Sequence, residues 1–410
     1  MTLAEAPLLL MLVGLTIYAV LGGADFGAAF WQLGSGSGRT AALREHAYRA
    51  MGPVWEANHV WLIFVLVICW TAYPDAFASI FSTLTVPLFI AALGVILRGT
   101  AYAIHAGTTR EIERRTIDTV FSISSILTPF ALGTAVGAIA SGRVPIGNAR
   151  GDLVTSWLNP SSIAIGVLAV ATGAYVAAVY LAGDGARAGQ GDLAAAFRTR
   201  ALVAGIGTGA IAFAALAVVV LDTGRVGDRL LEWPALAAVA ASALAGLSTL
   251  ELVRRSRFEA ARYGASAAVA AVVVGWALAQ RPELLPGLTV EEAAAERSAL
   301  IVTVVGVVAG LAIVVPSLAL LFGLVLRGRF DEEGREADVG VGEPGGRRSR
   351  ISPFRVALLL VAVGLPLTLV FDGGPFLAAG VLALLTFVAL ASLSLGAAAA
   401  ANDSSSESRR

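Results

Sequence analysis

Two acidic side chains stand inside otherwise apolar stretches and are the first candidates for chemistry. Asp25 lies in the run YAVLGGADFG (18–27), and Glu56 lies in PVWEANHVWL (53–62). An ionisable group within a membrane span is costly unless it faces protein or water, so each is a functional candidate. A carboxyl group beside a histidine, near an aqueous opening, can take up and pass on protons.

The residues around the second acid extend this candidate site. Helical spacing of three residues places Glu56 and His59 on one face, with Trp55 and Asn58 beside them. A structural role also stays open. In that role, Asp25 and Glu56 would cap or form hydrogen bonds to interrupted helices, and the neighbouring glycines at 22, 23 and 27 would allow close helix packing. The aromatic residues of this region could line a quinone or lipid groove or serve as anchors at the membrane surface; they are Trp55, Trp61, Trp70 and Tyr73.

Composition indicates which solvent surrounds these residues. Of the 410 residues, 57% are apolar and 14% charged, and the mean hydropathy of +0.80 is rare among water-soluble proteins. The 29 basic residues are all arginine and balance 29 acids, which argues against a nucleic-acid partner. The single cysteine, Cys69, excludes an intrachain disulfide, and no metal-binding motif occurs, so we expect no metal site.

The two acids lie in apolar stretches that are long enough to cross a bilayer. A transmembrane helix needs about 20 mainly apolar residues. The sequence predicts an all-α, polytopic membrane bundle of about eleven such spans. They lie near 7–31, 53–72, 77–98, 119–141, 161–182, 201–221, 234–250, 263–280, 299–326, 355–371 and 376–400.

Arginines concentrate in alternate connections and so predict the orientation. Because short cytoplasmic loops collect positive charge, we expect the N-terminus outside and the C-terminus in the cytoplasm of a multi-pass protein. The first span then runs inward and the second outward. Asp25 and Glu56 would lie roughly 9 Å and roughly 5 Å from the cytoplasmic ends of their helices. The two acids are therefore predicted to share one depth.

The rest of the chain divides by composition. Residues 1–330 form the main membrane domain with nine spans, and residues 331–354, which are charged and Gly-rich, are predicted to be a disordered cytoplasmic linker. Residues 355–400 would form an appended transmembrane hairpin of two helices. Residues 401–410 would form a disordered tail.

The motifs around the two acids resemble those of subunit II of cytochrome bd-type quinol oxidases. The family's DGFDLG-like motif stands here as GGADFG (22–27), and its PxWDGNxVWL-like motif stands as PVWEANHVWL (53–62). Further matches follow in the family's order. They lie at 73–78, 97–99, 128–137, 158–160, 198–200 and 326–329.

The resemblance implies a nine-span subunit of an oxidase in the bacterial plasma membrane, which helps to deliver cytoplasmic protons for reducing oxygen to water. In that family haem b and haem d belong to the partner subunit I, and quinol, lipid, a bound quinone and a small single-span subunit are further candidate partners. Carried over to this chain, proton transfer would fall to Asp25 and Glu56, with His59 as an auxiliary. Quinone contact or orientation would fall to Trp55, Asn58 and Arg98.

Some positions depart from the family's pattern, and other functions remain open. Gly22 replaces the family's first acid, Glu56 stands in place of Asp, and His59 stands where an amide or acid is common. A secondary transporter is one alternative, because a Gly-interrupted first span and membrane-embedded acids are also features of carriers. A purely structural subunit that binds lipid or quinone is another.

Overall fold

The computed structural model describes residues 2–32, 55–105, 111–326, 379 and 386. Within these ranges, the side chains of 55–57, 105, 111–115 and 313–326 are not described. The chain divides into two compact units, Met1–Arg327 and Gly328–Arg410. The predicted linker, nearly all of the predicted hairpin 355–400 and the predicted tail lie outside the described residues.

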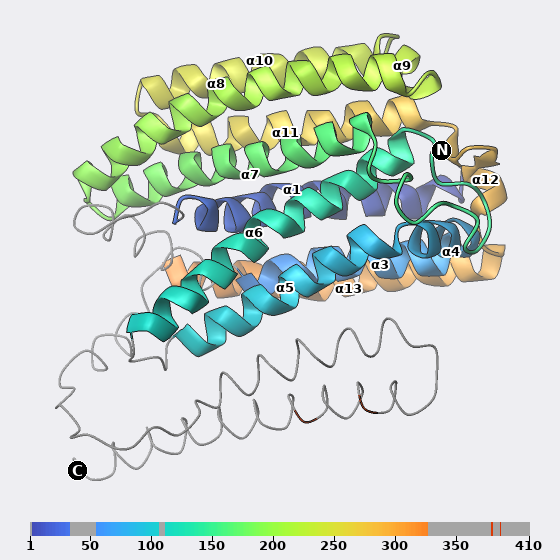
Figure 1. The fold of residues 1–410 in the computed structure, drawn as a ribbon, viewed down its shortest axis with the longest axis horizontal. Coiled ribbons are helices and arrows are strands. Elements are labelled where there is room, and N and C mark those ends of the chain that lie inside the picture. The colour runs from blue at the N-terminus through green and yellow to red at the C-terminus, as the bar shows by residue number, and fades with distance from the viewer. Residues whose placement is uncertain (1, 33–54, 106–110, 327–378, 380–385, 387–410) are drawn as a thin grey trace. The chain divides into compact units, whose positions relative to one another are not determined.

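The first unit is built from helices, as Figure 1 shows, and confirms the expected all-α membrane bundle. Seven of its helices are long and apolar enough to cross a membrane, and α3 and α13 add the apolar stretches Asn58–Ala72 and Arg297–Ala312. The helices are α1 (Glu5–Phe30), α3 (Trp55–Ala72), α4 (Pro74–Thr83), α5 (Thr85–His105), α6 (Glu111–Ala140), α7 (Pro160–Arg187), α8 (Gly191–Asp222), α9 (Arg225–Leu230), α10 (Ala235–Arg254), α11 (Phe258–Gln280), α12 (Val290–Ala293) and α13 (Arg297–Leu326).

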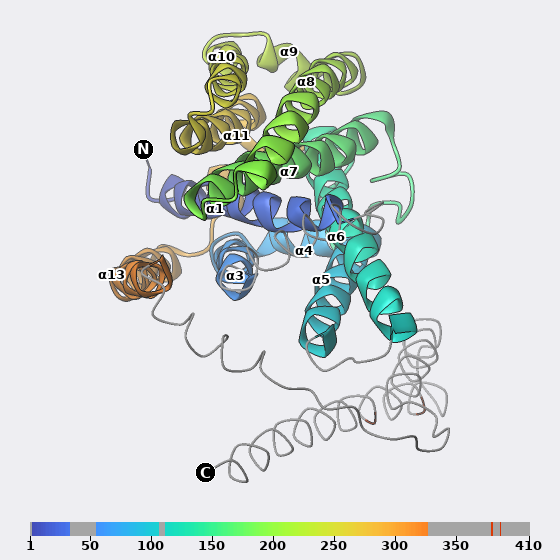
Figure 2. The same ribbon diagram turned by 90° about the vertical axis from the view of Figure 1, so that its left-hand side faces the viewer.

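Helix α1 lies at the centre of this unit. It packs against α3, α6, α7 and α11, while α8 and α10 form an outer layer on α7 and α11 (Figures 1 and 2). The most apolar windows of α6 and α7 are 56% and 50% buried, whereas that of α10 is only 11% buried. Side chains on α8 and α10, whose apolar windows are only 17% and 11% buried, therefore lie mostly at the surface of this unit.

The sequence specifies the start of α7 closely. Asn159 is the N-cap residue, and its side-chain oxygen accepts a hydrogen bond of 3.0 Å from the backbone N–H of Ser162. Pro160 occupies the first helical position, where its missing N–H costs nothing. The predicted fifth span thus begins one residue earlier than expected.

The third predicted span, 77–98, is divided in the structure. A short helix, α4, ends at Thr83, and α5 begins at Thr85 after a turn at Leu84. Pro87 explains the interruption, because it has no N–H to donate to the carbonyl of Thr83 four residues earlier. Span boundaries predicted from hydropathy alone miss this break.

Several helices also begin before the predicted apolar stretches. The starts expected at 119, 201 and 263 lie at Glu111, Gly191 and Phe258. These added turns are rich in Ala, Glu and Arg, which favour helix but lower the hydropathy, so an apolar window does not include them.

A small hairpin that the sequence did not predict connects α11 to α13. Strand β1 (Glu283–Leu285) pairs antiparallel with β2 (Leu288–Thr289), and Gly287 between them has φ +75°. A capping box follows, in which Thr289 and Glu292 exchange hydrogen bonds at the start of α12.

The N-terminal end of α1 is tied to distant parts of the chain near this hairpin. Glu5 forms an ion pair with Arg281, which directly precedes the hairpin. The Tyr73 hydroxyl donates a hydrogen bond of 2.5 Å to the carbonyl of Ala4. These contacts join the beginning of the first helix to residues 69 and 276 positions away in the sequence.

Candidate functional site

A buried ion pair joins α1 to α5 in the interior of the bundle. The guanidinium of Arg98 donates to both carboxylate oxygens of Asp25, with Nη1–Oδ2 and Nη2–Oδ1 distances of 2.6 Å. It also donates to the backbone carbonyl of Asp25 at 3.2 Å. Both side chains are essentially inaccessible, with exposures of 0% and 1%. Two parallel charge-assisted bonds of this kind fix geometry as well as charge.

Two aromatic rings contact the guanidinium of this ion pair. The Cζ atom of Arg98 lies 4.5 Å from the ring centroid of Phe26 and 5.0 Å from that of Phe121. A desolvated guanidinium is attracted to the negative face of an aromatic ring. Phe26 comes from α1 and Phe121 from α6, so three helices meet at one buried charge pair.

Close packing of α1 on α7 fixes the position of Asp25. A Cβ atom at Gly27 would lie 1.9 Å from the carbonyl oxygen of Gly173, so no other residue fits there without a shift of the helices. Trp31, one turn further along, donates its indole N–H to the carbonyl of Ala174 at 2.9 Å. The helix interface that glycine permits thus holds the acid opposite Arg98.

The first described side chains of α3 lie at the same level of the bundle. Asn58 is fully buried, and its amide donates to the carbonyl of Leu21 at 3.2 Å. The ring of His59 meets that of Phe26 edge-on, with 6.3 Å between centroids. Helix α3 therefore begins beside the segment of α1 that carries Asp25.

The structure brings together four of the six residues singled out from the sequence, namely Asp25, Asn58, His59 and Arg98. Trp55 and Glu56 belong to the first turn of α3, but their side chains lie outside the described residues. Phe121 was missed, because nothing in the sequence pattern marks one aromatic residue among many as the neighbour of a buried cation. In the described part of the chain, no group of three or more His, Cys, Asp and Glu side chains could hold a metal ion.

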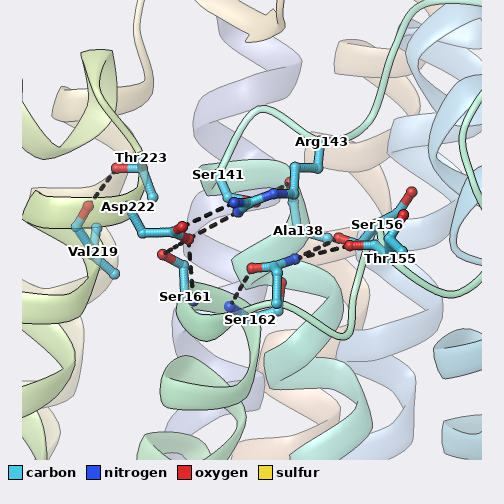
Figure 3. A network of polar contacts seen from close by, with 11 residues as sticks. Ala138, Ser141, Arg143, Thr155, Ser156, Ser161, Ser162, Val219, Asp222 and Thr223 are labelled. Carbon is cyan, nitrogen blue, oxygen red and sulfur yellow. Dashed lines mark hydrogen bonds and ion pairs between the residues drawn. The ribbon is translucent and has the colours of Figure 1, made fainter.

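A second ion pair, which the sequence analysis did not predict, lies at the start of α7 (Figure 3). Arg143 donates to both carboxylate oxygens of Asp222 at 2.8 and 2.9 Å, and the Ser161 hydroxyl donates to the same carboxylate at 2.7 Å. Hydrogen bonding to Asp222 raises the pKa of Arg143. This network ties the connection after α6 to the start of α7 and the end of α8.

Comparisons with known proteins agree with this architecture. The family model described as cytochrome bd terminal oxidase subunit II matches residues 3–325. The structure of bd oxidase from Geobacillus thermodenitrificans superposes with a TM-score of 0.66 over 80% of this chain and 99% of that chain, at 24% identity. The likeness in structure supports the fold.

Two curated relatives from Bacillus subtilis match shorter segments. The putative cytochrome bd menaquinol oxidase subunit II is 24% identical over 191 residues, covering 46% of this chain and 54% of the relative. The cytochrome bd ubiquinol oxidase subunit 2 is 28% identical over 96 residues, covering 23% and 28%. The chain thus spans about half the length of the first relative and less of the second. Because the family model covers all the helices from α1 nearly to the end of α13, the chain belongs to the family of cytochrome bd terminal oxidase subunit II.

Proposed function

We propose that this chain is the non-haem subunit of a quinol:oxygen terminal oxidase in the bacterial plasma membrane. In this proposal it covers and supports a haem-bearing partner subunit, and the complex oxidises quinol and reduces oxygen to water. The family match over residues 3–325 is the observation that carries the proposal. The same match does not favour a secondary transporter, the first alternative considered from the sequence.

We assign haem b and haem d to the partner subunit. The family match supports this assignment, because in the family that the motifs resemble the haems belong to the partner subunit I. The arginine distribution supports an N-terminus outside and a C-terminus in the cytoplasm. In that orientation the Asp25–Arg98 pair belongs to the cytoplasmic half of the membrane.

We assign proton delivery to Glu56, with His59 as an auxiliary and Asp25 as the residue that defines the electrostatic field around them. Each carboxylate oxygen of Asp25 accepts a hydrogen bond from Arg98, so both oxygens are held in a bidentate pair away from water. This pairing supports a positioning role for Asp25 beside the residues that carry protons. Asp25 thus acts on proton transfer through its charge.

Burial also sharpens the roles of the candidates for quinone contact. Arg98 and Asn58 are both fully buried among helices of this chain, and each is engaged with α1. Their proposed role is therefore to orient α1 and the proton-carrying residues. A bound quinone would have to contact other residues, for which Trp55 stays a candidate from the sequence.

Purification of the complex tests the main proposal. The chain would be co-expressed with the neighbouring haem-subunit gene and purified through a tag on this chain. We expect d-type and b-type haem bands in the reduced-minus-oxidised spectrum, together with quinol-driven oxygen uptake. Absence of those bands from a stable, correctly folded preparation would overturn the oxidase proposal.

Substitution of the second acid tests the proton assignment in that complex. Glu56→Gln should slow quinol oxidation and proton uptake from the cytoplasmic side while leaving the haem spectra unchanged, because the amide cannot carry a proton. Glu56→Asp should restore much of the rate. Glu232→Gln removes an exposed acid before α10 and serves as the matched control. Normal turnover and proton uptake in Glu56→Gln would return this residue to a structural role.

A further inference from the structure

The turn between α10 and α11 carries a concentration of positive charge that ion pairs with the described residues neutralise only in part. Arg254, Arg255 and Arg257 are all exposed. Glu251 is shared by two of them, accepting from Arg254 at 2.6 Å and from Arg255 at 2.5 Å. Arg257 forms no ion pair with any described residue. Among the described ion pairs, the three cations thus share the single carboxylate of Glu251, while the nearby Glu259 pairs with Arg187 and Arg262.

The backbone of this turn is fixed, so the arginines are held in a defined arrangement. Ser256 adopts a left-handed conformation with φ 57°, and the N–H of Arg257 donates to the carbonyl of Leu252 at 2.9 Å. From α8, the guanidinium of Arg198 donates to the carbonyl of Val253 at 3.1 Å. Arg198 therefore offsets the negative end of the α10 dipole and leaves the positive charge of the turn in place.

Two surface hollows adjoin Arg257, one on each side. The hollow toward α10 has a volume of about 490 Å³, and the hollow toward the end of α7 has a volume of about 460 Å³. Basic and apolar side chains share the lining of the first, so it offers both charge and an apolar wall. Its lining residues are Leu247, Ser248, Glu251, Leu252, Arg255 and Arg257.

An apolar track leads from the first hollow along the outer face of α10. Leu247, Glu251 and Arg255 follow one another at four-residue spacing, and Leu244 lies one turn before them on the same face. The exposed fractions of Leu244 and Leu247 are 65% and 64%. Helix α8, beside α10 in the outer layer (Figure 1), exposes Ile206 to 66%. One surface therefore presents arginines at its end and aliphatic side chains along its length.

We propose that this surface binds an anionic phospholipid, with the phosphate between Arg255 and Arg257 and an acyl chain along Leu244 and Leu247. An anionic headgroup supplies the negative charge that the turn lacks. A zwitterionic headgroup would bring its own cation toward three arginines. A free phosphate ion would leave the adjoining apolar face without a partner. The inference is independent of the oxidase activity and concerns only how this chain meets the membrane.

Lipid titration followed by native mass spectrometry tests the site on the full-length chain in detergent. Phosphatidylglycerol is the probe, phosphatidylcholine is the zwitterionic comparison, and inorganic phosphate is the competitor. We expect Arg255→Gln/Arg257→Gln to weaken phosphatidylglycerol binding about 25-fold, since each arginine near a membrane surface contributes about fivefold. The control, Arg150→Gln/Arg297→Gln, removes two exposed arginines elsewhere and should bind as the wild type does.

A charge-conserving variant separates loss of binding from loss of folding. Arg255→Lys/Arg257→Lys should keep most of the affinity and the preference for phosphatidylglycerol, because the positive charge remains. Equal affinity of the Gln variant and the wild type would overturn the proposal. Equal binding of phosphatidylcholine would also overturn it. Complete displacement by an equal concentration of inorganic phosphate would identify a site for free anions instead.

Discussion

Two Arg–Asp pairs in this bundle have the same chemistry and opposite surroundings. Arg98 and Asp25 are 0% and 1% exposed between α1, α5 and α6, whereas Arg143 and Asp222 are 35% and 20% exposed at an end of the bundle. Both pairs are bidentate. The buried pair is covered by two aromatic rings, and the exposed pair is supplemented by the hydroxyl of Ser161.

The difference shows how environment decides the energetic role of one interaction. Away from water, a charge that loses its partner has no solvent to replace it, so each member of the buried pair depends on the other. At the partly exposed pair, water and salt can replace a missing partner. We therefore expect the Asp25–Arg98 pair to be far less tolerant of substitution than the Arg143–Asp222 pair.

The largest effect should follow from breaking the buried pair on one side. Arg98→Gln leaves the carboxylate of Asp25 buried without its cation and should lower the free energy of unfolding by about 3–5 kcal/mol. Unfolding in mixed detergent micelles, followed by circular dichroism, measures the loss. The double variant Asp25→Asn/Arg98→Gln removes both charges and should recover more than half of it. A double variant as unstable as the single one would show that the charge is not the cause.

Removing one of the covering rings should have the next largest effect. Phe121→Leu keeps an apolar side chain but loses the cation–π contact with Arg98 and should lower the free energy of unfolding by about 1–2 kcal/mol. The same unfolding measurement applies. Phe213→Leu alters a ring that is 76% exposed on α8 and should have no measurable effect. Equal losses in the two variants would contradict a specific role for Phe121.

Substitution at the partly exposed pair should cost less and depend on salt. We expect Arg143→Gln to lower the free energy of unfolding by about 1 kcal/mol at low ionic strength, and by less at about 1 M salt, where screening is strong. Comparing the variant with the wild type at both salt concentrations gives the measurement. A loss as large as that of Arg98→Gln, insensitive to salt, would remove the distinction between the two pairs.

A third ion pair extends the comparison to the hairpin. The N–H of Gly287 and the cation of Arg225 hold the pKa of Glu283 below its usual value. Because the folded-state pKa is lowered, this contribution is complete above the unfolded value of about 4.3 and is lost as the pH falls through the folded value. Hydrogen exchange at the backbone amide of Val290, which follows the hairpin, measures this contribution. After correction for the intrinsic exchange rate, the free energy of protection should decrease when the pH is below about 4, and the decrease should be less than about 1 kcal/mol. Glu283→Gln should abolish that pH dependence.

Much of the bundle could be predicted from the length of the apolar stretches, because that length reflects the energetics of crossing a bilayer. The break at Leu84 and the early start of α8 were missed, since one follows from a proline within an apolar run and the other from helix propensity in a polar stretch. Hydropathy averages over both effects. Sequence reasoning thus predicts which segments cross the membrane better than where each helix begins.

The candidate site was predictable only in part. Asp25 and Arg98 were each singled out, but they are 73 residues apart, and no local spacing rule joins an acid on α1 to a base on α5. Helix packing decides the pairing, and the close approach at Gly27 and Gly173 is a property of two distant segments. The start of α7 depends on local spacing instead, since Asn159 caps the backbone N–H of Ser162, and the predicted fifth span began within one residue of it.

The ties at the N-terminal end of α1 have a consequence for the order in which the protein is made. Glu5 leaves the ribosome long before Arg281, its ion-pair partner 276 residues later. The N-terminal end of α1 can therefore gain this ion pair only after α11, the seventh of the membrane-length helices, has been synthesised. A nascent chain stalled before residue 281 would contain α1 but would lack this clamp. Of the two ties at this end of α1, the Tyr73–Ala4 hydrogen bond joins segments that are made early, and the Glu5–Arg281 ion pair joins segments that are made far apart in time.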